Sequence, residues 1–539
     1  MRGLMMDSPL LISSILHHAE RWHADVEIVT RTVEGPIARY TYRDAAGRTA
    51  QLAHALQALG AAPGDRVATL AWNTHRHFEL YYAVSGIGAV LHTINPRLHP
   101  SQIAYIVNHA QDRYMFVDLT FLPIVEAIAG ALASVRGYVV LTGEATMPQT
   151  SLPNALCYER LLQAQSTQIQ WPVFDECTAS SLCYTSGTTG EPKGALYSHR
   201  STVLHALSGS SIEHNPRPEP NRCLMPAVPM FHVNAWGYPY FAPMMGAKLV
   251  LPGPGYDGES LYELMESERV SSAAGVPVIW LRLLAYLEES GKELHHLRCL
   301  RVGGSASPPS LIEAFENRGI EIAQGWGMTE TSPVCTTGAL LSEHRESSER
   351  LSYQTKAGRL VFGVDMKIVD EAGNELPRDG VAQGELCVRA PWAISAYYEN
   401  PAATQNAFTP DGWFRTGDIC SLDEQGYLTV RDRAKDLIKT GGEWISSIDL
   451  ENAAIDHPEV EEAAAIAVAH AEWGERPLLV VRRTAGSTLD HAAIVAFLAP
   501  KVASWWLPDE IVFVDEMPYT ATGKISKKTL RERHAQVNA

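Results

Sequence analysis

Residues 184–194, YTSGTTGEPKG, are the part of the chain whose residue types and spacing predict chemistry most directly. Four Ser or Thr hydroxyls, three glycines and Lys193 fall in this short stretch, which follows the apolar Leu182 and Cys183. Glycines let a backbone approach a ligand closely, and its N–H groups, joined by hydroxyls and an ammonium, form a concave anion site. A Walker A loop is excluded, since G-x-x-x-x-G-K-[ST] occurs nowhere. A solvated Ser/Thr/Gly linker is the alternative that composition alone would favour.

Residues 324–331, QGWGMTET, form a second segment of interest. Trp326 offers a flat apolar face on which a purine could stack. Thr329 could donate to a phosphate, and Glu330 supplies the hard carboxylate oxygen that Mg²⁺ prefers. A lone Trp is usually part of a core and a lone Glu is usually solvated. The combination in this order predicts a nucleotide and metal segment.

Two more loops follow β-like runs. Gly303-Gly304-Ser305-Ala306 comes after a run that ends at Val302, and by itself it is a plain strand-to-helix turn. Thr416-Gly417-Asp418 carries a carboxylate that could accept both hydroxyls of a ribose. An Asp in a turn more often bonds to its own backbone. Arg433, taken alone, is a surface charge.

The remaining candidates lie in the middle and at the end of the chain. Residues 229–237, PMFHVNAWG, hold His232, which without context is a satisfied core histidine. Lys524 follows Gly523 in a loop rather than on a helix, although a lysine near a C-terminus is normally solvated and inert. Residues 441–446, GGEWIS, are consistent with a β-turn between two strands.

Alternating β-like and helical runs must position these loops. Residues 300–302 and 320–322 are β-like, and the stretch between them has Ser307 as a predicted N-cap, prolines at 308–309 and apolar residues at helical spacing. Such strand–loop–helix–strand units predict α/β layers whose ligands bind at the loops after the strands.

The clearest boundary lies near residues 432–436, DRAKD. We expect a large α/β domain over residues 1–433 and a small α+β domain over residues 434–539. The small domain should contain β-like residues 463–469, a helix over 489–502 and β-like residues 511–514.

The bulk composition excludes some classes of function. A net charge of −17 over 539 residues argues against sequence-independent nucleic-acid binding, which needs a positive surface. The eight cysteines have no C-x-x-C spacing, which favours reduced thiols over disulfides or zinc. No apolar run is long enough to span a bilayer or serve as a signal peptide, so a cytoplasmic protein is expected.

The order of these motifs resembles the adenylate-forming superfamily, which includes acyl-CoA synthetases, nonribosomal adenylation domains and firefly luciferase. The resemblance covers essentially the whole chain and implies a multi-layered amino-terminal α/β domain with a mobile carboxy-terminal one. It implies ATP or AMP binding by Thr185, Ser186, Gly187, Thr188, Thr189, Gly190, Lys193, Gly304, Ser305, Ala306, Gln324, Gly325, Trp326, Gly327, Thr329, Asp418, Arg433 and Lys524, with Thr185 and Glu330 around Mg²⁺.

The same resemblance implies an AMP-forming acid:CoA ligase that uses ATP, Mg²⁺ and coenzyme A. Lys524, His232, Thr185 and Glu330 would be catalytic, and the acyl pocket would comprise His232, Trp236, Val276 and Met328. After adenylation the small domain would rotate about a hinge at Lys435, where many relatives have Asp. That rotation would withdraw Lys524 and bring in Gly441, Gly442, Glu443 and Trp444 for thioester formation.

The lack of a carboxylate in one segment and the similarity of several others to known ligases limit the choice of substrate. Residues 229–237 hold no carboxylate to pair with an amino-acid ammonium, so a simple carboxylic acid is expected. Residues 181–184, 196–201, 230–237 and 441–446 are similar to medium-chain acyl-CoA synthetases and to 3-methylmercaptopropionate:CoA ligases. Transfer to a carrier protein and a non-catalytic AMP sensor are the alternatives, and the resemblance implies a homodimer.

Overall fold

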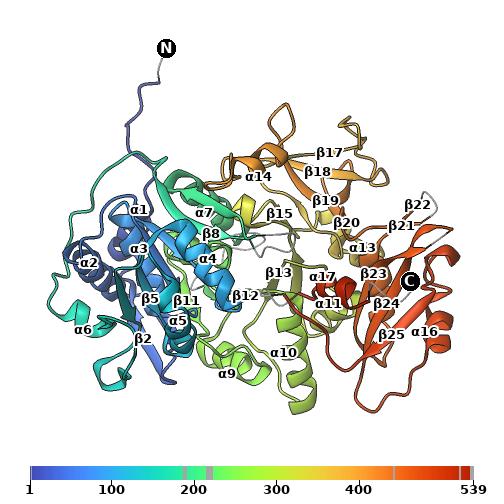
Figure 1. Ribbon diagram of the computed structural model, residues 1–539, viewed down its shortest axis with the longest axis horizontal. Coiled ribbons are helices and arrows are strands. Elements are labelled where there is room, and N and C mark those ends of the chain that lie inside the picture. Colours follow the sequence, from blue (N-terminus) through green and yellow to red (C-terminus); the bar gives the residue numbers. More distant parts are fainter. Residues whose placement is uncertain are drawn as a thin grey trace.

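The computed structural model describes residues 1, 3–185, 191–213, 222–440, 443–470, 472–520 and 524–534. Two seven-stranded sheets of the same plan form the larger part of the molecule (Figure 1). Each has six parallel strands and one antiparallel strand at an edge. The first has the order β14 (Glu321–Gln324), β13 (Cys299–Val302), β12 (Ser272–Gly275), β10 (Cys223–Pro226), β11 (Lys248–Leu251), β1 (Glu27–Arg31) and β2 (Ile37–Thr41). The second has the order β7 (Leu156–Cys157), β6 (Gly137–Val140), β5 (Asp112–Val117), β3 (Arg66–Leu70), β4 (Val90–Thr93), β8 (Ala179–Tyr184) and β9 (Gly194–Ser198).

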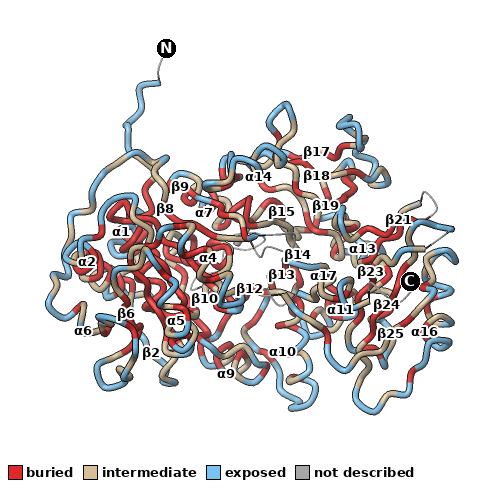
Figure 2. Tube along the Cα trace, in the orientation of Figure 1, coloured by how far each residue is buried: buried red, intermediate tan, exposed pale blue. Residues whose placement is uncertain are grey.

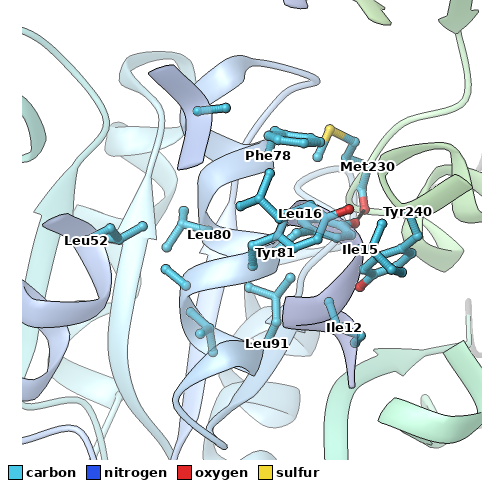
Figure 3. Packing of buried hydrophobic residues seen from close by; sticks show 14 of the residues in the cluster. Ile12, Ile15, Leu16, Leu52, Phe78, Leu80, Tyr81, Leu91, Met230 and Tyr240 are labelled. Atoms are coloured by element: carbon cyan, nitrogen blue, oxygen red, sulfur yellow. Dashed lines mark hydrogen bonds between the residues drawn. The ribbon is translucent and has the colours of Figure 1, made fainter. Parts of the chain in front are cut away.

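A layer of buried helices lies between these two sheets. Every residue of α3 (His75–Gly86) is buried. Leu80 and Tyr81 of this helix pack in an apolar cluster that also contains residues from strands of both sheets (Figure 3). The hydroxyl of Tyr81 donates to the carbonyl oxygen of Met230 at 2.5 Å, which ties the helix to the segment before the predicted acyl pocket. The other helices of this cluster are α1 (Ile12–Trp22), α2 (Tyr42–Ala58), α6 (Tyr158–Gln163), α7 (His199–Glu213) and α8 (Tyr238–Met245).

Other helices cover the outer faces of the two sheets, and each outer layer has its own apolar cluster. The helices over the first sheet are α9 (Gly258–Glu268), α10 (Pro277–Ser290) and α11 (Pro309–Glu316). Those over the second are α4 (Pro100–Ala110) and α5 (Leu122–Ile128), with the 3₁₀ turns η1 (Leu119–Phe121), η2 (Ala129–Ala131) and η3 (Glu144–Thr146) nearby in the chain. The parallel strands are therefore buried on both faces, as their continuous apolar sequences require.

Smaller antiparallel sheets complete the chain. One comprises β17 (Asp365–Val369), β18 (Gly384–Arg389), β19 (Phe414–Leu422) and β20 (Leu428–Arg433), and β15 (Thr336–Thr337) pairs with β16 (Arg359–Leu360). The other short helices are η4 (Val233–Gly237), which contacts α7 and α8, together with η5 (Thr329–Thr331), α12 (Ser342–Arg345), α13 (Arg350–Gln354) and α14 (Pro401–Asn406).

The carboxy-terminal unit is a five-stranded sheet covered by helices (Figure 1). It contains β21 (Ile438–Thr440), β22 (Glu443–Ile445), β23 (Val460–His470), β24 (Gly474–Arg483) and β25 (Glu510–Val514), with α15 (Ser447–Ile455), α16 (His491–Leu498), η6 (Ser504–Trp506) and α17 (Lys527–His534). Its own apolar clusters contain only residues from 438 onward. The predicted fold class, an α/β body with a smaller α+β unit, is confirmed, whereas the boundary between residues 433 and 434 stays a prediction.

Two local expectations differ from the structure. The N-cap of α11 is Pro308 and not Ser307, because the helix begins at Pro309 and Ser307 lies one residue before the cap position. The Ser307 amide donates to Oε1 of Gln324 at 2.8 Å. The predicted helix over 489–502 is shorter, and Asp490 caps it through the amide of Ala493. None of the helices in the described ranges is long and apolar enough to cross a membrane.

Candidate functional site

The stems of the 184–194 segment leave two neighbouring strands at the same edge of the second sheet. Tyr184 of β8 is paired with Gly194 of β9. The Thr185 amide donates to the Lys193 carbonyl at 2.9 Å, and the Lys193 amide donates to Oγ1 of Thr185 at 3.2 Å. These bonds close the base of a loop, as a ligand cradle requires. Ser186, Gly187, Thr188, Thr189 and Gly190 lie outside the described residues.

Glu330 lies beside this loop on η5 and is buried. The Tyr397 hydroxyl donates to its Oε1 at 2.7 Å, and the Lys193 ammonium lies 5.0 Å from the centre of the Tyr397 ring. Burial raises the pKa of Glu330, and the bond from Tyr397 opposes that rise. Lys193 and Glu330, which are 137 positions apart in the sequence, thus flank one tyrosine.

The donor set around Glu330 fits a magnesium ion that is shared with a substrate phosphate. In the described part of the chain, no group of three or more His, Cys, Asp or Glu side chains could enclose a metal. Mg²⁺ is commonly held by one or two carboxylates together with phosphate oxygens and water, so the single carboxylate of Glu330 fits such an ion.

Asp418 connects the predicted purine and ribose residues. Its carboxylate is almost fully buried; Oδ2 accepts the indole N–H of Trp326 at 2.9 Å, and Oδ1 pairs with Nε of Arg433 at 2.5 Å. Arg433 is opposite Asp418 in the β19–β20 ladder. Each carboxylate oxygen has two lone pairs, so each can still accept one hydroxyl. The structure brings these three residues together, although they are far apart in the sequence.

The 303–306 loop lies between Trp236 and Val276. A Cβ added to Gly303 would stand 3.1 Å from the Trp236 ring, and one added to Gly304 would stand 3.2 Å from Cγ1 of Val276. Gly304 also has a φ of +84°, which favours glycine. Ser305 is exposed and Ala306 is half-buried, so both are accessible in the loop.

Gln324 and the glycines after it shape the floor of this region. The Gln324 side chain makes two hydrogen bonds within the protein. Its Oε1 accepts from the Ser307 amide, and its Nε2 donates to the Thr355 carbonyl at 3.1 Å. A Cβ on Gly325 would lie 2.7 Å from the Thr336 carbonyl oxygen, and one on Gly327 would clash with that of Pro333. Thr329 is buried, and its carbonyl accepts the Tyr197 hydroxyl at 2.5 Å. Met328 packs partly buried against the cluster that contains Cys183, Ala195 and Tyr197.

Lys524 reaches this site from the carboxy-terminal unit. Its Cε lies 3.9 Å from the position of a Cβ on Gly304. The residue as a whole is exposed to solvent. Desolvation of its ammonium by the surrounding protein, with repulsion from Arg433, lowers the pKa of Lys524 to about 8, and attraction to Asp418 opposes the change. The ammonium is therefore poised near the residues predicted to hold a nucleotide.

His232 precedes a left-handed turn. Burial lowers the pKa of His232 to about 4, and the Lys524 charge lowers it further, so the ring is neutral near pH 7. Val233, Asn234, Ala235 and Trp236 all have positive φ angles between 43° and 54°. Asn234 holds the turn, since its Nδ2 donates to the Ser181 hydroxyl at 3.0 Å and its Oδ1 accepts from Tyr81 at 3.2 Å.

The predicted hinge and thioester residues lie elsewhere. Lys435 is exposed in a turn that follows β20. Trp444 is half-buried on β22, an edge strand at the periphery of the molecule (Figure 1). Gly441 and Gly442 lie outside the described residues, as does the side chain of Glu443. The structure therefore brings Lys524 to Gly304 and leaves Trp444 at the periphery.

Tyr397, Tyr197 and Asn234 are site residues that sequence reasoning did not assign. The two tyrosines act through non-local hydrogen bonds, for which no local pattern gives a signal. For Asn234 the sequence does give a signal, since an amide in an otherwise apolar segment must find hydrogen-bond partners when it is buried. The roles assigned to the individual site residues stay predictions.

Two family models match the chain. The one described as AMP-binding enzyme matches residues 15–398, and the one described as AMP-binding enzyme C-terminal domain matches residues 449–524. Their order along the chain agrees with the two units of the fold.

Individual proteins match over nearly the whole length. The chain is 48% identical to the 3-methylmercaptopropionyl-CoA ligase of Ruegeria lacuscaerulensis, covering 99% of this chain and 98% of that one. It is 46% identical to the medium-chain-fatty-acid–CoA ligase of Ectopseudomonas oleovorans, covering 100% and 98%. The crystal structure of the anthranilate CoA ligase AuaEII in complex with anthranoyl-AMP superposes with a TM-score of 0.86 at 26% identity, covering 98% of each chain.

Proposed function

This chain belongs to the AMP-binding enzyme family, and we propose that it joins a carboxylic acid to coenzyme A in two steps through an acyl-adenylate. Relatives named as acid:CoA ligases match it from end to end, which supports this reaction over a stand-alone nucleotide sensor. The observation that carries the proposal is the approach of Lys524 to Gly304, close to Asp418 and His232.

In the first step a carboxylate oxygen attacks the α-phosphorus of ATP, and the bond to pyrophosphate breaks. Two anions must meet, so positioning and neutralisation of charge matter most. Lys193 and the 185–190 segment hold the β- and γ-phosphates, and Lys524 bridges the carboxylate and the α-phosphate, a task suited to a compact ammonium. Mg²⁺ bound at Glu330 and Thr185 would neutralise phosphate charge.

The nucleoside is held by the residues around Asp418. Its free lone pairs accept the ribose hydroxyls, Arg433 supports the same carboxylate, and Trp326 offers its ring to the purine. The backbone of residues 304–306 and 324–327, with Thr329, completes the AMP site. The neutral ring of His232 lies beside the acyl carbon with Trp236, Val276 and Met328.

In the second step the thiolate of CoA attacks the acyl carbon, the bond to AMP breaks, and the thiol proton passes to solvent. We propose that residues 434–539 rotate about Lys435 between the steps, which withdraws Lys524 and brings in residues 441–444. The placement of Lys524 at Gly304 and of Trp444 at the periphery suits the first step.

The substrate is a short or medium-chain acid, such as 3-methylmercaptopropionate or a medium-chain fatty acid. Its support is the two relatives' names and the lack of a carboxylate in residues 229–237. Apolar pockets separate acids that differ by one methylene by only about 1–3 kcal/mol, so several acids should react. A cytoplasmic homodimer is part of the same proposal.

The deciding experiment measures AMP release with MgATP and CoA over acids from acetate to dodecanoate, with 3-methylmercaptopropionate and benzoate included. We expect AMP only when both acid and CoA are present. Acid-dependent pyrophosphate release without AMP release, even when CoA is present, would indicate an enzyme that stops at the adenylate or uses a carrier protein. Tight ATP binding with no AMP from any acid would favour the sensor.

A further inference from the structure

A buried contact crosses the 434–436 turn that separates the two units. Asp432 is 1% exposed and stands opposite Ile419 in the β19–β20 ladder, so its backbone belongs to the four-stranded sheet. Ser447 begins α15, whose Leu450 and Ala454 are buried in the carboxy-terminal apolar cluster. The two residues therefore belong to different bodies, although only 15 positions separate them.

Hydrogen bonds join these bodies at the start of α15. The Ser447 amide donates to Oδ2 of Asp432 at 2.6 Å, and the Arg433 amide donates to Oδ1 at 2.7 Å. The Ser446 hydroxyl donates to the Arg431 carbonyl at 2.6 Å. A carboxylate that accepts amides at both oxygens beside a helix amino terminus makes strong, charge-assisted bonds.

The charges near this contact divide into those that cross the turn and those that do not. Lys527 pairs with Glu451 at 2.6 Å, and Arg531 pairs with Asp436 at 2.8 Å, all from residue 436 onward. These two pairs would move with the carboxy-terminal unit and be kept in any orientation, whereas the Lys527 charge also attracts Asp432 across the turn. One ion pair, between Lys439 and Glu371 at 3.7 Å, does connect the two bodies. Both of its side chains are more than half exposed, so it contributes little to the stability of the contact.

We propose that Asp432 is a positioning residue that latches the carboxy-terminal unit in the orientation in which Lys524 reaches the site, and that this latch opens between the two half-reactions. The inference rests on the proposed function. A rotation about residues 434–436 would carry the Ser447 amide away while Asp432 stays on β20, so the bond exists in one orientation only. An interaction made in one of two states shifts their populations by its full free energy.

Three single variants test the latch. Asp432→Asn has one acceptor oxygen for two amides and loses the charge, with little change in shape. Ser447→Pro removes the amide donor at the first position of α15, where proline is well tolerated, and the Ser446 backbone (φ −70°, ψ 117°) already suits a following proline. Ser447→Ala is the matched control, because it removes only the hydroxyl and keeps the amide.

The half-reactions are measured separately, as acid-dependent ATP–pyrophosphate exchange and as acyl-CoA formation from supplied acyl-AMP and CoA. For Asp432→Asn and Ser447→Pro we expect the ratio of the second rate to the first to rise about tenfold, as loss of one charge-assisted bond implies. Ser447→Ala should keep the wild-type ratio. An unchanged ratio in both test variants, or an equal fall of both rates, would overturn the latch. Failure of the proposed function itself would appear earlier, as a wild-type protein without either half-reaction.

Hydrogen exchange gives a readout that needs no turnover. In the wild type with MgATP, the amides at the start of α15 should be protected, because Ser447 is buried and bonded to Asp432. Asp432→Asn should speed exchange in residues 443–455 and leave β24 unchanged. Equal exchange in residues 443–455 of the two proteins would contradict the proposal, and faster exchange throughout would show general destabilisation instead.

Discussion

Glu330 and Asp418 are both buried carboxylates, but their neighbours suit them to different ligands. Asp418 pairs with Arg433 and accepts the indole N–H of Trp326, so both of its oxygens already have partners within the protein. Glu330 receives one bond from the neutral hydroxyl of Tyr397, and burial raises its pKa. The second group is the one that gains most from a cation, since a cation would offset the cost of burying its charge.

Tyr397→Phe should weaken magnesium binding. Loss of the hydroxyl removes a contribution that lowers the pKa of Glu330, so the carboxylate becomes harder to ionise. A hydrogen bond to a charged group contributes roughly 1.5–3 kcal/mol, so we expect a tenfold or larger rise in the apparent KM for Mg²⁺, greater at pH 6 than at pH 8. Adenylation rates over a Mg²⁺ titration measure this. Tyr398→Phe removes a hydroxyl from the next residue and should behave as the wild type; equal effects of the two variants would contradict the assignment.

Lys524 should give adenylation a limb of falling activity at alkaline pH. Its lowered pKa means that the ammonium is present below about pH 8 and is lost above it. We expect kcat/KM for acid-dependent pyrophosphate exchange, measured without CoA so that its thiol does not titrate, to fall as pH rises through about 8.

Two variants separate this assignment from others. Lys524→Arg stays charged at all working pH values, so the falling limb should disappear even if the rate is lower. Lys524→Ala should abolish adenylation and spare acyl-CoA formation from supplied acyl-AMP. A limb that persists in the arginine variant, or equal loss of both half-reactions in the alanine variant, would show that another group carries the role.

The family could be identified from the sequence because its residues are clustered in short ordered segments, and that assignment is confirmed. The contacts that complete the site could not be predicted from the sequence. Trp326 meets Asp418, and Tyr397 meets Glu330, through the tertiary fold, and no spacing in the sequence links the members of either pair.

At the scale of elements, the turn η4 is unusual because a run of residues with side chains adopts left-handed backbone. Each such residue costs roughly 1–2 kcal/mol relative to a right-handed conformation. The bonds of Asn234 to Ser181 and Tyr81 help to hold the turn, and the result is that Trp236 lies against Gly303. Strain of this kind persists where the surroundings determine the conformation.

Gly237→Ala should damage both stability and the acyl pocket. Gly237 ends the turn at φ +86°, and a Cβ there would lie 2.9 Å from the His205 ring. Gly64→Ala is the matched control, because Gly64 has φ +82° and open space around it. We expect about 1–2 kcal/mol of destabilisation for the control and at least about 1 kcal/mol more for Gly237→Ala, with a higher KM for the acid. Urea unfolding and acid titrations measure both; equal losses would mean that His205 yields freely.

Helix and strand identities were more predictable than their ends. The β-like residues 300–302, 463–469 and 511–514 fall in strands, as do residues 321–322 of the predicted run 320–322, because apolar β-type runs bounded by turns have few alternatives. The predicted start of α11 is wrong by one residue, since the helix begins after Pro308 and not after Ser307.

For the whole molecule, the two large sheets differ in how they are assembled from the chain. The second sheet uses residues 66–198, in one continuous part of the sequence. The first sheet uses residues 223–324 and adds β1 and β2 from the start of the chain at one edge. Residues 27–41 therefore belong to a sheet whose other strands all lie about 200 residues further along the chain.

Deletion of residues 1–6 should have no effect on the folded protein, in contrast to longer deletions. Leu4, Met5 and Met6 are at least 87% exposed, and this arm projects from the body (Figure 2). We expect a melting temperature within about 1 °C of the full chain and unchanged AMP release. Deletion of residues 1–31 removes α1 and β1, uncovers the edge of β11, and should give insoluble protein. A soluble, active product of the longer deletion would contradict the structural role of β1.

The parallel pairing of Ile28, Val29 and Thr30 with Leu249, Val250 and Leu251 also determines when the chain can fold during its synthesis. About 220 residues separate the partners, and a ribosome that adds about 5–20 residues per second needs about 10–45 seconds to make them. For that time β1 has only β2 as a neighbour and its other edge stays unpaired, while the second sheet can already assemble. This open edge is a template for pairing with other chains until β11 has been made.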